Sequence, residues 1–203
     1  MKYAFTLCFI GAAVCSYVLA QRGGPILLLI GGMCILFSIL YTAPPFPLAY
    51  LGLGDVFVLF FYGPVATMFC YYLQTLHFSY EVLGASWAPG LLGVSVLTMN
   101  NLRDYDEDNK VHKKTLVVRL GLTYGKIQYL LALAFCFLIP PALALSTHAH
   151  FFSLAASLAL LTLLPAIKKV LSNPSSSDLN LVFMRTARIT PIYTVLFCLG
   201  WLF

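Results

Sequence analysis

Seven apolar runs, each close to the length that spans a lipid bilayer, dominate this sequence of 203 residues. A membrane helix needs about 20 predominantly apolar residues. Inside a bilayer every backbone polar group needs an internal partner, and a helix provides one. We therefore predict an all-α, polytopic membrane helix bundle that forms a single membrane domain over residues 1–203. About seven transmembrane helices are expected, over residues 3–20, 25–40, 55–75, 86–101, 124–146, 151–171 and 180–203.

The few charged residues are distributed unevenly along the chain. Only 9% of the residues are charged and 61% are hydrophobic, which excludes a soluble globular domain. If the seven runs alternate across the membrane, all Lys and Arg residues except Arg22 fall on one side. Basic loops stay in the cytoplasm, so we expect that side to be the cytoplasmic face of a bacterial-type inner membrane. Topology also explains the net charge of +5, and we expect no nucleic-acid partner.

Two local features qualify the helix pattern. The first run also fits a cleavable signal peptide, although a retained helix is favoured because six further runs follow it. Pro64 and the pair Pro140-Pro141 lie in the middle of apolar runs. Proline removes a backbone donor and collides with the preceding turn, so we expect a kink or a break at both places.

An acidic stretch follows the fourth run. Four of the seven Asp and Glu residues lie within residues 104–108. Asn100, Asp104 and Asp108 recur every four residues, so they would share one face if the fourth helix continued beyond the membrane surface. Two carboxylates at that spacing can hold one Mg²⁺, which prefers oxygen ligands and is usually completed by water and phosphate. The stretch therefore predicts a magnesium site.

Basic side chains beside the acidic stretch suggest an anionic ligand. Arg103, Lys113 and Lys114 offer charged donors suited to phosphate. Spacing alone leaves open a solvated charged loop between two helices. A further alternative is a cation transporter or membrane scaffold that uses the stretch as an ion-binding site at its entrance. Transporters place ionisable groups near the bilayer midplane, however, and these runs contain almost none.

The same stretch resembles a known motif. Residues 100–108, NNLRDYDED, with residues 113–121, KKTLVVRLG, resemble the second aspartate-rich motif of the UbiA-type membrane prenyltransferases. Residues 41–55, YTAPPFPLAYLGLGD, are similar to a cytoplasmic loop of the branch that prenylates 1,4-dihydroxy-2-naphthoate in menaquinone synthesis. The resemblance implies Mg²⁺-dependent transfer of a polyprenyl group from polyprenyl diphosphate to that acceptor. Within the same superfamily, 4-hydroxybenzoate and homogentisate are alternative acceptors.

The resemblance also assigns roles to residues. It implies that Asp104 and Asp108 hold a metal ion and that Arg103 and Lys113 stabilise the departing pyrophosphate. Substrate-binding roles fall to Asn100, Asn101, Lys114 and Tyr41. Tyr41 would contact the naphthoate, although a tyrosine at a membrane interface also serves as an anchor. His112 stands where glycine is common in this branch, which predicts a stiffer loop.

One family feature is missing from this sequence. Members have nine helices and carry a first aspartate-rich motif, N-D-x-x-D, at the end of the second helix. Before Asp104 this sequence has only Asp55 and Glu81 as acidic residues. We expect the seven runs to correspond to the third to ninth family helices and the chain to be inactive alone. A separate chain is a possible source of the first motif.

Overall fold

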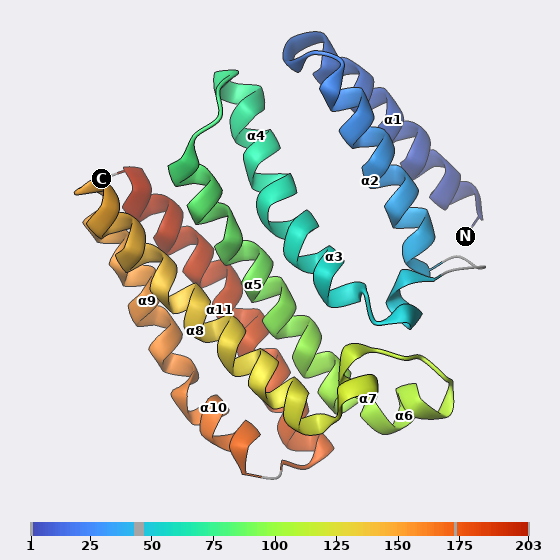
Figure 1. Ribbon diagram of the computed structural model, residues 1–203, viewed down its shortest axis with the longest axis vertical. Helices are drawn as coiled ribbons and strands as arrows, with labels where there is room; N and C mark the ends of the chain where they lie inside the picture. Colours follow the sequence, from blue (N-terminus) through green and yellow to red (C-terminus); the bar gives the residue numbers. More distant parts are fainter. Residues whose placement is uncertain (1, 43–46, 173, 203) are drawn as a thin grey trace.

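The computed structural model describes residues 2–42, 47–172 and 174–202, and its regular structure is helical (Figure 1). The first half contains α1 (Lys2–Gly23), α2 (Ile26–Thr42), the 3-10 turn η1 (Leu48–Leu51), α3 (Gly54–Phe60), the π-helical turn η2 (Phe61–Val65), α4 (Ala66–Thr75) and α5 (Tyr80–Arg103). The second half contains α6 (Tyr105–Lys110), α7 (Leu116–Leu120), α8 (Leu122–Thr147), η3 (Phe151–Ser153), α9 (Leu154–Leu160), η4 (Leu161–Leu163), α10 (Leu164–Leu171) and α11 (Ser176–Leu202).

These elements form the predicted membrane bundle. Six helical segments in the described ranges, some of which join several of these elements, are long and apolar enough to cross a membrane. The α2 helix, with 17 residues, is shorter and lies at the lower limit of the ~17–25 residues that span a bilayer. Each predicted apolar run is therefore helical, and the prediction of an all-α polytopic bundle is confirmed.

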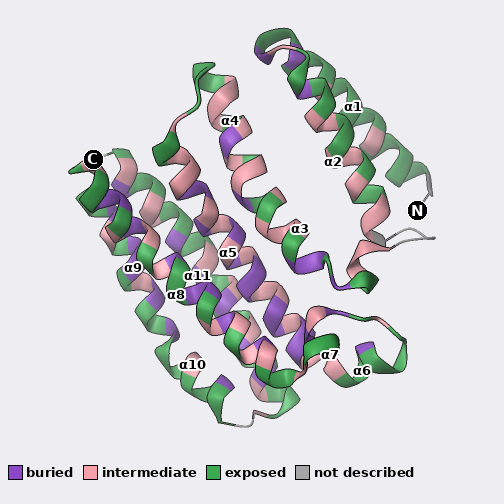
Figure 2. Ribbon diagram, in the orientation of Figure 1, coloured by how far each residue is buried: buried purple, intermediate pink, exposed green. Residues whose placement is uncertain are grey.

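The core lies between α5, α8, α11 and the segment from α9 to α10. Of the membrane-length helices, α5 is the most buried, with 44% of its most apolar window inside the protein, whereas α1 has 6%. Figure 2 shows the buried residues concentrated along α5 and its neighbours, and the α1–α2 hairpin largely exposed. Small residues on α5, among them Ala85, Ser86, Ala88 and Gly90, are buried. Such residues let helices approach closely where lipid gives no hydrophobic driving force between them.

Two buried hydrogen bonds join α8 to α11. The Tyr129 and Thr186 hydroxyls lie 2.9 Å apart. The Tyr193 hydroxyl donates to the backbone oxygen of Cys136 at 3.0 Å. In an apolar surrounding such polar groups need partners, so these bonds fix the relative rotation of the two helices.

The two proline sites behave differently. The kink predicted at Pro64 is confirmed, because Gly63 leaves helical geometry (φ −95°, ψ −110°) between α3 and α4. At Pro140-Pro141 no break is formed, since α8 runs continuously from Leu122 to Thr147. Pro140 is fully buried there. Packing against neighbouring helices lets a membrane helix tolerate proline.

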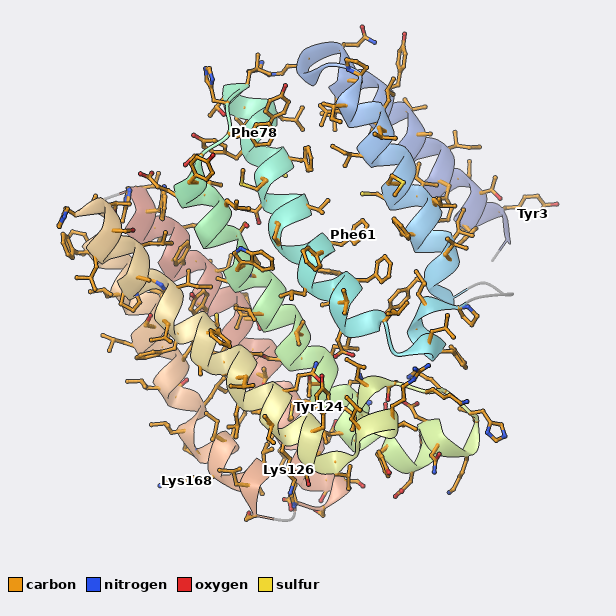
Figure 3. The ribbon with its side chains drawn as sticks, in the orientation of Figure 1. Tyr3, Phe61, Phe78, Tyr124, Lys126 and Lys168 are labelled. Atoms are coloured by element: carbon orange, nitrogen blue, oxygen red, sulfur yellow. The ribbon has the colours of Figure 1, made fainter. Side chains whose placement is uncertain are left out.

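The connections between helices lie at the ends of the bundle that an alternating topology requires. The η1 turn, α6, α7 and the α10–α11 connection lie at one end of the bundle (Figure 1). Lys126 and Lys168 lie at that same end (Figure 3). Arg22 lies in the α1–α2 turn at the opposite end, where its guanidinium donates to the backbone oxygens of Leu73 and Gln74 at 2.6 and 3.0 Å. These bonds tie the α1–α2 hairpin to the end of α4.

Candidate functional site

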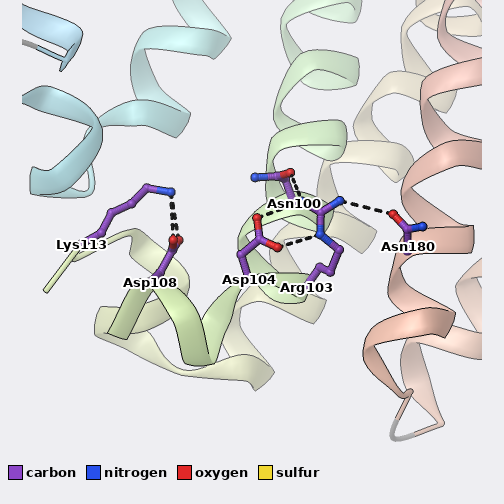
Figure 4. A network of polar contacts seen from close by, with 6 residues as sticks. All are labelled: Asn100, Arg103, Asp104, Asp108, Lys113 and Asn180. Carbon is purple, nitrogen blue, oxygen red and sulfur yellow. Dashed lines mark hydrogen bonds and ion pairs between the residues drawn. The ribbon is translucent and has the colours of Figure 1, made fainter. Parts of the chain in front are cut away.

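Arg103, the last residue of α5, organises one part of the site (Figure 4). Its Nε and Nη2 atoms donate to the two carboxylate oxygens of Asp104 at 2.6 and 2.9 Å. Nη2 also donates to Asn100 Oδ1 at 2.7 Å, and Nη1 donates to Asn180 Oδ1 of α11 at 3.3 Å. The guanidinium is therefore held by groups from α5 and α11 together. Four of its five N–H groups are thereby directed at protein oxygens, which fixes the orientation of this positive charge.

Asp108 and Lys113 form a second pair. The ammonium of Lys113 lies 3.1 and 3.0 Å from the two carboxylate oxygens of Asp108, whose side chain is only 9% exposed. A turn at His112, where φ is +57°, brings Lys113 back toward Asp108. A side chain in that left-handed region is strained, whereas glycine is not. His112 therefore occupies a position that glycine would adopt without strain.

The expected single helical face is not formed. The α5 helix ends at Arg103, Asp104 lies at the break (φ −93°, ψ 11°), and α6 begins at Tyr105. Asp104 is held by Arg103, while Asp108 is held by Lys113 on the other side of the break (Figure 4). The condition that the fourth helix continues one or two turns past the membrane face is wrong, because the backbone leaves helical geometry at Asp104.

Four of the predicted site residues line a small polar cavity. Its volume is about 220 Å³, and it lies where η1, α3, α5 and the loop after α6 meet. Predicted residues on its wall are Tyr41, Asn100, Asn101 and Lys113. The structure places Lys114 elsewhere: its side chain is exposed, and its backbone bonds to Tyr50 and Arg119. Asp104 and Asp108 are outside the cavity wall, although Asn100 and Lys113 connect them to it.

The structure adds residues that the sequence patterns missed. Asp55, in the first turn of α3, is 5% exposed and lines the same cavity. Gln128 of α8 donates to its Oδ1 atom at 2.8 Å. Because acidic residues are so scarce before Asp104, the sequence could have identified Asp55 as a candidate site residue. Asn180 lies 77 positions from its partner Arg103, and no short-range pattern indicates that contact.

Apolar cavities adjoin the polar one. A cavity of about 540 Å³ lies between α3, α5 and α11 and shares Leu97 and Asn100 with the polar cavity. Its remaining wall is mainly apolar and consists of Val58, Tyr62, Pro89, Gly93, Val96, Phe183, Ala187 and Thr190. A further cavity of about 320 Å³ between α2 and α3 shares Tyr41. An elongated apolar ligand with a polar head therefore has room for both parts.

Three side chains of the site could contribute oxygen ligands to a metal. The described residues contain no cluster of three or more His, Cys, Asp or Glu side chains that could complete a metal shell alone. Asp104, Asp108 and the amide oxygen of Asn100 are hard oxygen donors, and Mg²⁺ is usually completed by water and substrate phosphate. The hydrogen bond from Arg103 lowers the pKa of Asp104. That carboxylate therefore stays charged at neutral pH, as a metal ligand must.

These features define a class of protein: a polytopic membrane helix bundle with a polar, charged site at one end and apolar cavities beside it. Comparison with known families then gives the assignment. The UbiA prenyltransferase family model matches residues 1–201. The chain belongs to the UbiA prenyltransferase family.

Curated relatives agree with this membership. The chain is similar to the 1,4-dihydroxy-2-naphthoate octaprenyltransferase of Haemophilus influenzae, with 33% identity over 85% of the chain and 56% of the relative. The Mycobacterium tuberculosis protein of the same description is 40% identical over 60% of the chain and 42% of its own length. For the Escherichia coli protein the identity is 42%, over 54% of the chain and 35% of the relative. The chain thus spans about half or less of the length of these relatives.

Proposed function

We propose that this chain contributes to the active site of an enzyme that transfers a polyprenyl group from polyprenyl diphosphate to 1,4-dihydroxy-2-naphthoate. Three similar proteins are 1,4-dihydroxy-2-naphthoate octaprenyltransferases, which supports this acceptor. One structural observation carries the proposal: Asn100 lies both on the polar cavity and on the large apolar cavity, and its side chain bonds to Arg103. A diphosphate head and a prenyl tail would meet at that residue.

Each part of the site has a physical role in this reaction. Asp104 and Asp108 would hold Mg²⁺, which would neutralise charge on the diphosphate oxygens. Arg103 and Lys113 donate hydrogen bonds to those oxygens, whose charge grows as the allylic carbon–oxygen bond breaks. The apolar wall of the large cavity would pack against the prenyl chain and keep water away from the allylic cation on that side. Asn100 and Asn101 orient the head group, and Tyr41 packs against the acceptor ring.

The proposed location follows from charge. The end of the bundle that carries the site also carries most of the basic residues, which favours a cytoplasmic position at a bacterial inner membrane. Lipid, polyprenyl diphosphate and the naphthoate acceptor are the partners that this function requires. A separate chain or segment carrying an N-D-x-x-D motif would add a second group of metal ligands.

The metal assignment can be tested with Asp104→Ala and Asp108→Ala. Membranes containing the chain are supplied with Mg²⁺, a polyprenyl diphosphate and dihydroxynaphthoate, and the prenylated product is quantified. The chain is assayed alone and together with a segment that carries the first motif. We expect product only in the second case, and each variant should lower turnover on the order of 100-fold, as loss of one preorganised electrostatic group does.

A matched control is Asp106→Ala, which removes an exposed carboxylate from the same short helix. Its turnover should stay within about 3-fold of the wild type, because exposed charges interact weakly. Undiminished turnover in both Asp104→Ala and Asp108→Ala would refute the metal assignment. Robust product from the chain alone would refute the need for a second segment.

A further inference from the structure

Asp55 is a buried carboxylate that the proposed metal and diphosphate site does not use. It lies in the first turn of α3, and its side chain lines the polar cavity opposite Asn100, Asn101 and Lys113. Only 5% of the residue is exposed. A buried carboxylate is costly unless it is paired or bound to a ligand.

No ion pair compensates this carboxylate among the residues that the structure describes. The ion pairs found there join Arg103 to Asp104, Lys113 to Asp108 and Lys169 to Asp178. Lys113, which shares the cavity with Asp55, thus already bonds to Asp108. The partner of Asp55 is the neutral amide of Gln128, at 2.8 Å from Oδ1. A buried ionisable group in a membrane protein without a charged partner points to a functional site.

Gln128 strengthens this interpretation. Its Nε2 atom bonds to Asp55, while its own Oε1 atom is buried and has no hydrogen-bond partner in the described structure. An unsatisfied buried oxygen is rare and unfavourable. The amide is therefore oriented to hold Asp55. Together with a bond from its own backbone amide, the Gln128 bond leaves part of the acceptor capacity of the carboxylate free for a ligand.

We propose that Asp55 binds a phenolic hydroxyl group of the aromatic acceptor and so orients the ring, an inference that rests on the proposed function. Without a metal ion the carboxylate would repel a diphosphate, whereas it accepts a strong hydrogen bond directly from a hydroxyl. The cavity of about 220 Å³ is smaller than the ~300–1,000 Å³ of sites for larger ligands. It therefore suits a small ring rather than a prenyl chain.

The surrounding groups fit the rest of such an acceptor. Tyr41 supplies an aromatic side chain and Leu97 an apolar one on the cavity wall. Leu97 and Asn100 belong to both the polar and the large apolar cavity. A ring held at Asp55 therefore lies beside the place where the prenyl chain would end. A hydrogen bond from the hydroxyl to a carboxylate also enriches the ring in electron density, which favours attack on an allylic cation.

The test compares two probes on the full chain in lipid nanodiscs. One is 1,4-dihydroxy-2-naphthoate under anaerobic, reducing conditions, and the other is 2-naphthoate, which lacks both hydroxyl groups. A site built to bind a hydroxyl rejects an analogue without it. We expect the wild type to prefer the dihydroxy compound by about 10- to 100-fold in Kd, and Asp55→Ala to reduce that preference to less than about 3-fold.

Two further variants control for misfolding and charge. Asp55→Asn keeps the shape and can still accept the bond from Gln128, so its preference should lie between those of the wild type and the alanine variant. Asp106→Ala should keep the wild-type preference. Mg²⁺-dependent binding of geranylgeranyl diphosphate should be unchanged in every variant, because Asp55 does not contact Asp104 or Asp108.

The outcomes separate this inference from the proposed function. Full hydroxyl preference in Asp55→Ala would overturn the inference while leaving the proposed function intact. Loss of Mg²⁺-dependent diphosphate binding in that variant, with the hydroxyl preference retained, would make Asp55 a metal ligand instead. A wild-type chain that binds the diphosphate but neither naphthoate would contradict the proposed acceptor and this inference together.

Discussion

The hydrogen bonds of Arg22 predict how firmly the α1–α2 hairpin is attached. Its Nε atom donates to Leu73 O at 2.6 Å and its Nη2 atom to Gln74 O at 3.0 Å. Both oxygens lie in the last turn of α4, where the helix dipole favours a cation. The Tyr72 hydroxyl returns a weaker bond, at 3.3 Å, to Gly23 O. Replacement of Arg22 therefore removes two charged bonds between elements that are distant in sequence.

The magnitude follows from the number and exposure of these bonds. A hydrogen bond to a charged group contributes about 1.5–3 kcal/mol, and we discount this to about 1 kcal/mol each because Arg22 is exposed. Arg22→Ala should therefore favour detachment of the hairpin by ~2 kcal/mol, or about 30-fold. Lysine cannot reach both oxygens with a planar fork, so Arg22→Lys should lose ~1 kcal/mol, or about 5-fold.

Hydrogen exchange measured by mass spectrometry in nanodiscs tests this attachment. Amides in peptides covering residues 20–28 and 70–79 should exchange faster in the order wild type, Arg22→Lys, Arg22→Ala. The control is Arg185→Ala, which removes an exposed arginine from α11 and should leave these peptides unchanged. Equal exchange in wild type and Arg22→Ala would refute the reasoning. Because α2 carries Tyr41, faster detachment should also weaken naphthoate binding.

Two further predictions concern helix packing and charge. An added methyl group at Gly90 would collide with the backbone oxygen of Leu59, whereas one at Gly11 meets open space. Gly90→Ala should therefore lower the free energy of unfolding by ~1–3 kcal/mol, and Gly11→Ala should raise it slightly. Thermal unfolding in detergent measures both changes. Arg103 lowers the pKa of Asp104, so the stability that this pair contributes is present above about pH 4 and is lost as the pH falls through the lowered pKa. Melting curves of the wild type and Arg103→Gln should accordingly differ at neutral pH and converge in acid, and a constant difference would contradict the pairing.

The sequence by itself determined the membrane class and the location of the polar site. Seven apolar runs require helices because lipid offers no partners to backbone groups, and the alternation of basic loops gave the relative orientation of the helices. The scarcity of charge made residues 100–114 conspicuous. These conclusions depend on local composition and on spacing along one helix, both of which are properties that a sequence displays directly.

Tertiary structure decided how the site is assembled. The break at Asp104, where α5 ends and α6 begins, is not revealed by a periodic pattern of residues. Continuity of α8 through Pro140 depends on burial against neighbouring helices. The contact between Asp55 and Gln128 joins residues 73 positions apart. Such contacts are fixed by packing among helices rather than by propensity within one, and for that reason the cavity and its buried carboxylate become visible only in three dimensions.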